Sequence, residues 1–383
     1  MKILVLASWY PDEEKPLNGI YFKEQVEALK ENGVDVCVLN IHLDSISNLF
    51  RKKKIRFSKC KENNVNIYRV KSYNYFPKVY NGYIRYYAYL LKKYIKEIES
   101  IEGRFDLVHV HSAFDAGIAY SISNLDIPYV ITEHSSRFHR GVINKSENNL
   151  LYSAFLKANK IISVGKGLSE KIQIYCKDKI PVIIPNMVKD VECNNIELDN
   201  KRNKFRFFSL AFLNKYKGMD VLIKSFAKNN VLLRECELYI GGNGEELENL
   251  KQLSKDLGVE RNIKFLGELN REEVNYYMKN SDAFVLASRV ETFGIVFIEA
   301  MYQGKPVIGT RTGGPDTFIN NEVGLTVEVD NIDELSEAMN YIYNNYKQYD
   351  NKVIKKYCID TFSEKVIVEK LNKVYKEVLK LNE

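Results

Sequence analysis

Short apolar runs alternate with amphipathic stretches along most of the chain. In the first half these runs are KILVLAS, VDVCVLN, VNIYRV, FDLVHVHS, PYVITEH, KIISVG and PVIIPN. Runs rich in valine and isoleucine, separated by segments of helical periodicity, are typical of parallel strands covered on both faces by helices. The pattern therefore predicts an α/β fold with a doubly wound sheet in the first half.

A polar stretch without periodicity, MVKDVECNNIELDNKRN, interrupts this alternation, which starts again at FRFFSLA. At 383 residues the chain is too long for one ordinary core, so two domains are expected. We predict a first Rossmann-like domain over residues 1–187, a linker over 188–203 and a second Rossmann-like domain over 204–360. A last helix is predicted within 361–383, with no strand after it. Ligands of such sheets bind beyond the carboxyl ends of the strands.

The net charge of +6 is unevenly distributed. Residues 1–187 hold 28 Lys and Arg against 19 Asp and Glu, whereas the remainder holds 28 against 31. A basic first half suits an anionic partner, and a solvated surface with a chance excess of lysine is the alternative. The first apolar run is too short for a signal peptide and no stretch reaches the length of a membrane span, so a cytoplasmic protein is expected. The six cysteines show no metal-type spacing.

Chemistry concentrates after the predicted strand DAFVLAS, in the stretch SRVETFGIVFIEAMYQG. A helix is predicted to begin near Gly294, and the free amides at a helix start bind phosphate readily. Glu291 in the loop and Glu299 in the helix would flank that phosphate, and carboxylates accept hydrogen bonds from sugar hydroxyls. The pattern indicates a nucleotide-sugar site. A capped helix with a solvated glutamate stays open as an alternative, because three other glutamate pairs here are also eight apart.

The segment ETFGIVFIEAMYQGKPVIGTRTGG resembles the donor-binding segment of the GT4-type retaining glycosyltransferases of GT-B fold (glycosyl transferases group 1), whose hallmark is a Glu-x7-Glu pair. KYKGMDVLIKSFA and LYIGGNGEELENL follow the family's order, and PLNGIYFKEQVEAL resembles its first glycine loop. The resemblance covers essentially the whole chain. It implies two Rossmann-like domains facing each other across a cleft, with the last helix crossing back to the first domain.

The resemblance implies that Glu291 binds hydroxyls of the transferred sugar and that Glu299 holds the ribose of the nucleotide. Lys217, in KYKG, matches the family's lysine on the diphosphate. The residues implied to face the phosphates and the sugar through their amides are Gly19, Phe293, Gly294 and Ile295.

His111 ends the predicted strand FDLVHVHS, where the family usually places a histidine beside the reacting sugar, and it is a catalytic candidate with Glu291. His134 ends the next strand and is a further candidate. Phe212 stands where many members carry an arginine, and Lys215 is the residue that could replace it.

The function implied is a retaining hexosyltransferase that uses a nucleotide-diphosphate sugar and a glycan or lipid-linked acceptor, in bacterial cell-surface polysaccharide or glycolipid synthesis. A GT-B-fold sugar-nucleotide epimerase and a non-catalytic donor-binding subunit are the alternatives. No Asp-x-Asp motif occurs, so no metal is expected, and no cofactor beyond the donor. A dinucleotide-dependent oxidoreductase is disfavoured because neither first strand precedes a G-x-G-x-x-G motif.

Residues 73–98 hold eight tyrosines and Phe76 among several lysines and arginines, and RKKKIR (51–56) is a second basic segment. One helical stripe runs along this segment and consists of Tyr83, Tyr87, Leu90, Leu91, Tyr94 and Ile98. It fits a helix that packs on the sheet with tyrosine edges exposed. The composition also fits a rim that rests on an anionic membrane surface, peripheral at the inner face of the cell membrane, and admits a lipid-linked acceptor. No recognition module for nucleic acid accompanies it, so no nucleic-acid partner is expected.

Overall fold

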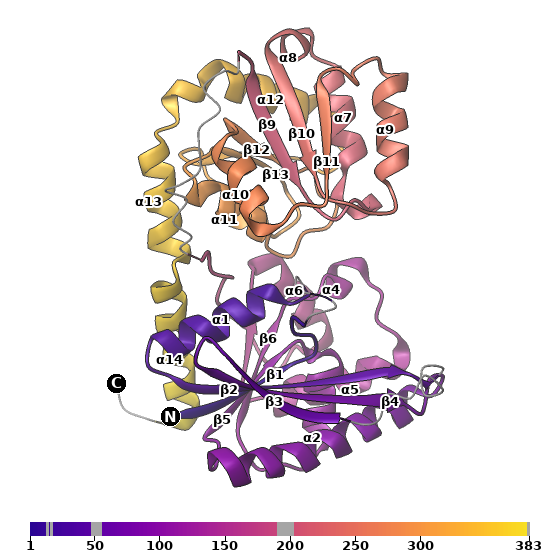
Figure 1. The fold of residues 1–383 in the computed structure, drawn as a ribbon, viewed down its shortest axis with the longest axis vertical. Coiled ribbons are helices and arrows are strands. Elements are labelled where there is room, and N and C mark those ends of the chain that lie inside the picture. Colours follow the sequence, from indigo (N-terminus) through magenta and orange to yellow (C-terminus); the bar gives the residue numbers. More distant parts are fainter. Residues whose placement is uncertain (13–14, 16–17, 47–55, 190–202, 381–383) are drawn as a thin grey trace. The chain divides into compact units, whose positions relative to one another are not determined.

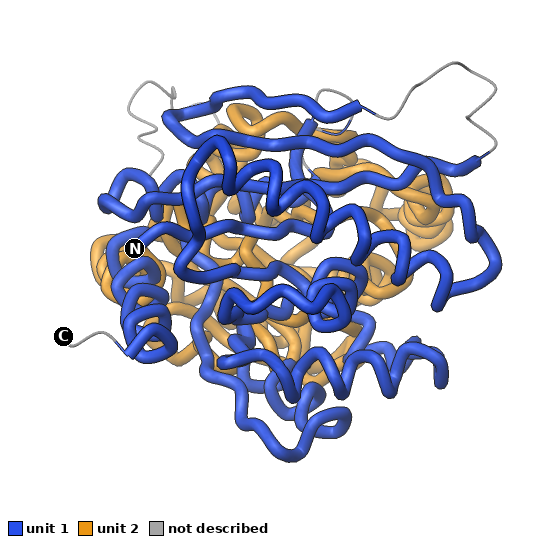
Figure 2. Tube along the Cα trace, turned by 90° about the horizontal axis from the view of Figure 1, so that it is seen from below, with its two compact units in different colours: residues 1–187, 364–383 blue, residues 188–363 orange. Residues whose placement is uncertain are grey.

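The chain divides into two compact units, which are described separately below (Figure 2). Unit 1 comprises Met1–Met187 and Glu364–Glu383, and unit 2 comprises Val188–Ser363. The computed structural model describes residues 1–12, 15, 18–46, 56–189 and 203–380. Most of the predicted linker, and residues 51–55 of the RKKKIR segment, lie outside the described residues.

Unit 1 is built on an eight-stranded sheet with the strand order β3-β4-β2-β1-β5-β6-β7-β8 (Figure 1). The strands are β1 (Lys2–Ala7), β2 (Asp35–Ser45), β3 (Arg56–Glu62), β4 (Val65–Asn74), β5 (Leu107–His111), β6 (Tyr129–Glu133), β7 (Lys160–Ser163) and β8 (Val182–Ile183). All pairings are parallel except that of β3 with β4. The antiparallel edge strand β3 was not predicted, because its sequence RFSKCKE carries no apolar run and most of its side chains are exposed or half-buried.

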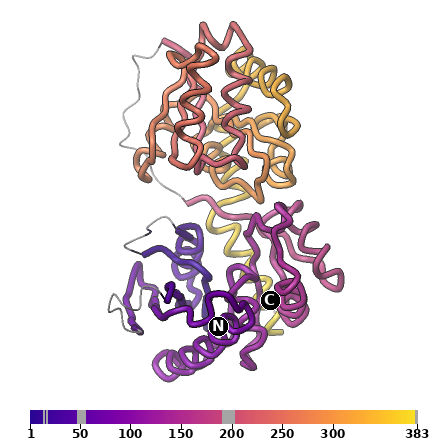
Figure 3. Tube along the Cα trace, turned by 90° about the vertical axis from the view of Figure 1, so that its right-hand side faces the viewer, coloured from indigo at the N-terminus to yellow at the C-terminus, as the bar shows by residue number. Residues whose placement is uncertain are grey.

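The helices of unit 1 connect these strands. They are α1 (Ile20–Glu31), α2 (Tyr80–Glu102), α3 (Ile118–Ile122), α4 (Arg137–Arg140), α5 (Lys145–Lys157), α6 (Lys166–Tyr175) and α14 (Glu364–Leu379), with a π-helical turn at Ala113–Gly117. Helix α14 packs beside α1, and Figure 3 shows this C-terminal helix in yellow among the segments of unit 1. Both helices bury apolar side chains against one face of the sheet. The hydroxyl of Tyr375 on α14 lies 2.7 Å from Nδ1 of the buried His109 on β5.

Helix α2 shows how the tyrosine-rich segment is divided between core and surface. Most of the predicted stripe is buried, including Tyr87, Leu91 and Tyr94. The hydroxyl of Tyr87 donates to the carbonyl oxygen of Ile41 on β2, 3.3 Å away. Tyr89, in contrast, is 61% exposed. The predicted packing of this segment on the sheet is therefore confirmed for the stripe, and a separate aromatic surface remains.

Unit 2 is built on a six-stranded, all-parallel sheet with the order β11-β10-β9-β12-β13-β14. The strands are β9 (Phe205–Leu210), β10 (Cys236–Gly241), β11 (Ile263–Gly267), β12 (Ala283–Val285), β13 (Val307–Thr310) and β14 (Gly324–Val327). The α-helices are α7 (Met219–Ala227), α8 (Asn230–Glu235), α9 (Leu247–Asp256), α10 (Arg271–Lys279), α11 (Ile295–Tyr302), α12 (Ile332–Asn345) and α13 (Asn351–Phe362). Buried Phe208, Phe284 and Phe297 join β9, β12 and α11 through edge-to-face ring contacts.

Each sheet contains one place where the strand order reverses. In unit 1, β1 lies between β2 and β5, and in unit 2, β9 lies between β10 and β12. Loops leaving the two central strands at such a point turn to opposite faces of the sheet and open a crevice at its carboxyl edge. The functional residues of each unit are therefore to be sought after β1 and β5, and after β9 and β12.

Candidate active site

The switch point of unit 2 brings Lys217 and Glu291 together. Lys217 ends a 3-10 turn, Lys215–Lys217, which follows β9, and Glu291 lies in the loop after β12. Nζ of Lys217 is 2.7 Å from Oε2 of Glu291, and the Glu291 side chain is 11% exposed. Oε1 of Glu291 accepts a hydrogen bond from the amide of Thr292 at 3.1 Å. A carboxylate and an ammonium group, 74 residues apart in sequence, thus share one half-buried position.

Glu299 is held on α11 by an arginine that sequence reasoning did not single out. NH1 of Arg271, the first residue of α10, lies 2.6 Å from Oε1 of Glu299. The Glu299 side chain is 14% exposed, so its carboxylate faces the surface only in part. No local pattern links α10 to α11, and this pairing could be found only from the fold.

Helix α11 begins at Gly294 in a conformation that suits glycine. Gly294 has φ 92°, and a Cβ atom built on it would come within 2.5 Å of the Phe297 ring. The ring of Phe293 is buried against Phe318 and Phe362, so Phe293 offers the site only its backbone. Ile295 is half-buried at the first helical position. The first amides of a helix have no intrahelical acceptor, so this helix start is open to an anion.

Arg289 fixes the position of the turn that carries Lys217. Its NH1 donates to the carbonyl oxygen of Lys215 at 2.6 Å, and both terminal nitrogens bind the carboxylate of Asp220 at 2.9 Å. Its Nε binds Asp330, and its own amide donates to the carbonyl oxygen of Tyr216. The hydrogen bonds that Arg289 donates to Asp220 raise the pKa of Arg289. Arg289 lies two residues before Glu291, in a loop that was already predicted to be functional. Its charge in that loop was the sequence signal that could have identified it as a site residue.

Lys215 and Phe212 occupy the surface near this turn. The Lys215 side chain lines a cavity of about 430 Å³ together with Asp220, Glu246 and Arg289. Phe212, which stands where many family members carry an arginine, is 64% exposed. Replacement of that arginine by Lys215 stays a prediction.

The switch point of unit 1 brings together His111, at the end of β5, and His134, which follows β6. Nδ1 of His111 lies 3.2 Å from Nε2 of His134, and both rings contact the ring of Phe22 on α1. Burial, and then the neighbouring histidines His109 and His134, hold the pKa of His111 well below its usual value. Burial lowers the pKa of His134 to about 3. Both rings are therefore neutral at physiological pH, and one N–H donates to the other ring.

Two nitrogen atoms of this histidine pair are left over. Nε2 of His111 and Nδ1 of His134 are buried, and within the described part of the chain neither has a hydrogen-bond partner. Buried polar groups are nearly always paired, so an orphaned pair of ring nitrogens marks a place where a ligand can complete the hydrogen bonding. His109 differs, because its two nitrogens are bound by Thr132 and Tyr375.

Glu133 orders the loops around the histidines and was missed by the sequence reasoning. This buried carboxylate accepts hydrogen bonds from the amides of Ala113, His134 and Ser135 at 2.7–2.8 Å. Burial raises the pKa of Glu133, and these three amides oppose that rise. Next to His111, Ser112 has φ 73°, a left-handed conformation that is strained for serine.

Gly19 opens α1 in unit 1. Its φ is 77°, and a Cβ atom there would lie 2.9 Å from the backbone oxygen and ring of Trp9. The backbone at the start of α1 is thereby packed closely against Trp9, which lies two residues after the end of β1. Among residues 1–12, 15, 18–46, 56–189 and 203–380, no three His, Cys, Asp or Glu side chains are grouped so that they could hold a metal ion. None of the helices in these ranges has the length and apolarity that crossing a bilayer requires.

Comparisons with known proteins agree with this architecture. The family model described as "Glycosyltransferase Family 4" matches residues 19–190, and that described as "Glycosyl transferases group 1" matches residues 192–357. An uncharacterized glycosyltransferase of Methanocaldococcus jannaschii is 30% identical over 266 residues, covering 67% of this chain and 70% of the relative. A second one from the same organism is 26% identical and covers 96% and 97%.

Two further matches widen the comparison. A lipopolysaccharide core biosynthesis glycosyltransferase of Rhizobium meliloti is 29% identical over 194 residues, covering 50% of this chain and 55% of the relative. The crystal structure of Anabaena HepE in complex with UDP superposes with a TM-score of 0.75 at 16% identity, covering 98% of this chain and all of the other.

The fold and these matches define a glycosyltransferase of GT-B type, as predicted. The chain belongs to the GT4 family of glycosyltransferases, whose two family models match it one after the other.

The start of α11 gives a test of the packing in unit 2. Gly294→Ala places Cβ against the Phe297 ring, whereas Gly258→Ala introduces the same residue at a positive φ of 67° with nothing within 4 Å. We expect Gly258→Ala to lower the free energy of unfolding by about 1–2 kcal/mol. Gly294→Ala should lower the free energy of unfolding by about 1–3 kcal/mol more than Gly258→Ala, because the Phe297 ring or the start of the helix must shift. Urea unfolding of the full chain measures both, and equal losses would contradict the close approach at Gly294.

Proposed function

We propose that this glycosyltransferase is a retaining hexosyltransferase that uses a nucleoside diphosphate sugar. The observation that supports this most is the contact between Lys217 and Glu291 beside the start of α11. It combines a cation, open helix amides and a carboxylate in one place. Those are the groups that a diphosphate and an adjoining sugar require.

In the proposed reaction the bond between C1 of the sugar and the diphosphate oxygen breaks, and the acceptor oxygen forms a bond to C1 and passes its proton to the departing diphosphate oxygen. The configuration at C1 is the same in donor and product. Negative charge develops on the leaving diphosphate, where Lys217 and the amides of Gly294 and Ile295 stabilise it. Positive charge develops on the sugar, and the carboxylate of Glu291, bound to its hydroxyls, stabilises that charge.

Glu299 has a different task in this proposal. A ribose does not change during the transfer, so the carboxylate of Glu299 contributes to binding rather than to the chemical step. Arg271 keeps that carboxylate oriented. Gly19 in unit 1 contributes its backbone amide to the phosphates.

His111 contributes a neutral hydrogen-bonding group beside the reacting sugar. Its pKa is far below the physiological range, so it does not act there as a cation. Its unpaired Nε2 can bind a sugar hydroxyl without displacing a protein partner. His134 then fixes the ring of His111 through the hydrogen bond to Nδ1.

The nature of the donor and the biological setting are proposed from relatives. Anabaena HepE was crystallised with UDP and with UDP-glucose, and its fold matches this chain, which favours a uridine nucleotide sugar as the first donor to test. The Rhizobium relative acts in lipopolysaccharide core biosynthesis, which favours a bacterial cell-surface glycan or glycolipid as the product.

A peripheral association with anionic membranes is part of the same proposal. Tyr89 on α2 is 61% exposed, and Val79 and Phe76 before the helix are 58% and 42% exposed. Exposed basic residues of α2 accompany them, namely Arg85, Lys93 and Lys96. Exposed aromatic groups next to basic side chains suit an interface of anionic headgroups and acyl chains.

Replacing Glu291 and Glu299 by glutamine should have different effects on catalysis and on nucleotide binding. Loss of a charge-assisted hydrogen bond costs about 1.5–3 kcal/mol, so Glu291→Gln should lower kcat on the order of tenfold to a hundredfold. It should leave UDP affinity nearly unchanged. Glu299→Gln should weaken UDP binding and raise KM for the donor with a smaller effect on kcat. Calorimetry with UDP and steady-state kinetics on the full chain measure both effects.

Glu260→Gln is the matched control, because Glu260 is exposed and is also one of a pair eight residues apart. It should behave as the unmodified protein. Equal losses of UDP affinity in Glu291→Gln and Glu299→Gln would refute the separate sugar and ribose roles.

Transfer is expected to be independent of metal, because Lys217 and the helix amides neutralise the diphosphate. Activity with the best donor should therefore survive an excess of EDTA. Complete loss on chelation, restored by Mn²⁺, would show that a metal ion carries this charge.

Binding to liposomes tests the membrane proposal. Co-sedimentation should rise with the fraction of phosphatidylglycerol and fall with salt, because exposed charges are screened. Replacing Tyr89 and Val79 by serine should reduce it. Equal sedimentation with neutral and anionic vesicles, or none, would exclude the proposed surface.

A further inference from the structure

A polar pocket lies at the edge of the unit 1 sheet where the carboxyl ends of its parallel strands meet. None of the site residues assigned above lines it. Its cavity volume is about 70 Å³, and it adjoins a larger depression of about 620 Å³ that shares three lining residues with it, Asp12, Arg69 and Lys71. A water molecule takes about 30 Å³ in the liquid, and ligand pockets span about 300–1,000 Å³. The space thus suits a small polar group attached to a larger body.

The floor of the pocket follows from how far β2 and β4 extend. Under α1, the neighbouring pair Val38 and Ile67 belongs to the apolar core. Side chains on one face of a strand recur every second residue. The next pairs on that face are Asn40 with Arg69 and His42 with Lys71. Strand β1 ends at Ala7, opposite Asn40, so β2 and β4 continue beyond both the core and their neighbour.

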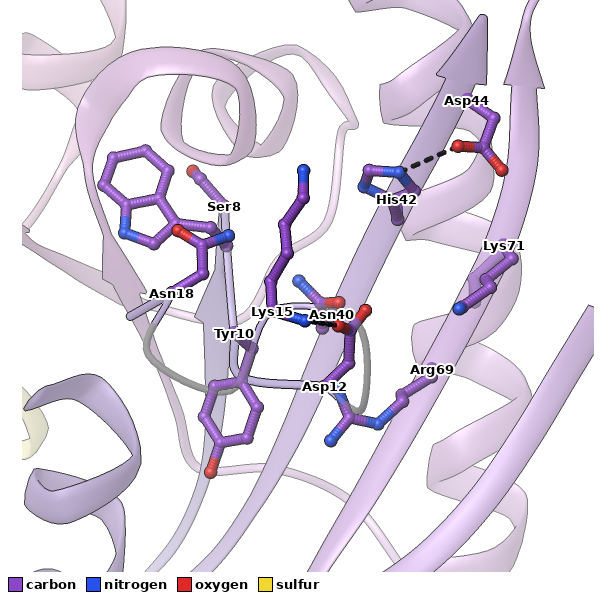
Figure 4. Close-up of a pocket in the computed structure, with 12 residues that line it drawn as sticks. Ser8, Tyr10, Asp12, Lys15, Asn18, Asn40, His42, Asp44, Arg69 and Lys71 are labelled. Atoms are coloured by element: carbon purple, nitrogen blue, oxygen red, sulfur yellow. Dashed lines mark hydrogen bonds and ion pairs between the residues drawn. The ribbon is translucent and has the colours of Figure 1, made fainter. Parts of the chain in front are cut away.

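The acidic side chains of the pocket are already engaged. Oδ1 of Asp44 lies 3.0 Å from Nε2 of His42, drawn as a dashed line in Figure 4. Oδ1 of Asp12 accepts the amide of Lys15 at 2.8 Å. Arg69 forms an ion pair with Glu62, in which NH2 lies 3.2 Å from Oε1. Glu62 itself does not line the smaller pocket.

The ammonium groups are not engaged in this way. Among the described residues, neither Lys71 nor Lys15 has an ion pair or a side-chain hydrogen bond. Figure 4 shows Lys71 beside Arg69 on β4, with the Lys15 side chain extending between Ser8 and His42. The larger depression adds Arg56 to its wall, together with Lys23 and Lys59, which are ion-paired with Glu62 at 2.6 Å and with Glu102 at 3.0 Å. Lys71 and Lys15 therefore give the pocket two positive charges that no ion pair of the described residues neutralises, beside the carboxylates of Asp12 and Asp44. Positive charge of this kind on a concave surface attracts anions.

We propose that this pocket binds an anionic group, a phosphate or a carboxylate, on the acceptor. The inference rests on the proposed function, in which Lys217, Glu291 and Glu299 bind the donor and none of the residues assigned to the donor lines this pocket. Lys71 and Arg69 contact the anion, and the larger depression takes the body of the acceptor. The acceptor of this glycosyltransferase is thus an acidic molecule, and Lys71 is a specificity-determining residue.

Binding of three simple sugars to the full chain tests this inference. Glucose 6-phosphate, glucuronate and glucose are titrated by calorimetry in the presence and absence of saturating UDP. Either acid should bind at least tenfold more tightly than glucose, with an affinity that falls as salt rises. The stronger of the two acids identifies phosphate or carboxylate as the preferred group.

Variants assign the site. Lys71→Gln should remove the advantage of the acids, Lys71→Arg should retain most of it, and Lys171→Gln, on the exposed face of α6, should change nothing. Equal binding of the three sugars, or acid binding that is unaffected by Lys71→Gln, would overturn the inference. So would acid binding that UDP abolishes, since the anion would then occupy the donor site. None of these results bears on UDP binding and its loss in Glu299→Gln, which test the proposed function separately.

Discussion

The placement of every candidate residue depends on the parallel direction of the strands. In a parallel sheet all carboxyl ends meet at one edge, so residues distant in sequence are delivered to the same place. The reversal of strand order then selects one position along that edge. This is why Lys217 after β9 meets Glu291 after β12, and why His111 at the end of β5 lies near Phe22 in the first turn of α1. The same rule acts twice in one chain, once in each unit.

The two carboxylates assigned to the donor are each paired with a cation in the chain by itself. Glu291 is bound to Lys217 and Glu299 to Arg271. A half-buried carboxylate without a partner would be unfavourable, and these pairs keep both side chains ordered before any ligand arrives. In the proposed function, hydroxyls of the sugar replace the cations as hydrogen-bond donors, and Lys217 then binds phosphate. The site therefore exchanges partners instead of exposing a bare charge.

Local signals in the sequence account for what could be predicted. The apolar runs predict the buried strands of both sheets, and the stretch SRVETFGIVFIEAMYQG predicts a helix that begins near Gly294. Periodicity predicts the stripe on α2, which is buried. Edge strand β3 escapes because a surface strand needs no apolar run. The sequence does not reveal the roles of three further residues, Arg289, Arg271 and Glu133. Their partners lie on other elements, and only the fold brings them together. The roles assigned to the site residues remain predictions until they are measured.

Strands β2 and β4 extend beyond the apolar core beneath α1. The residues that stabilise the fold there and the residues that line the pocket are therefore different ones. On the face beneath α1, side chains up to Val38 and Ile67 are constrained by close packing, whereas Asn40, His42, Arg69 and Lys71 on the same face line a cavity. A substitution at one of these pocket positions changes what the pocket attracts while the packed layer beneath α1 keeps its shape. If the proposed acceptor site is correct, substitutions at a few strand positions could change the acceptor while Lys217, Glu291 and Glu299, the residues assigned to the donor in the other unit, stay the same.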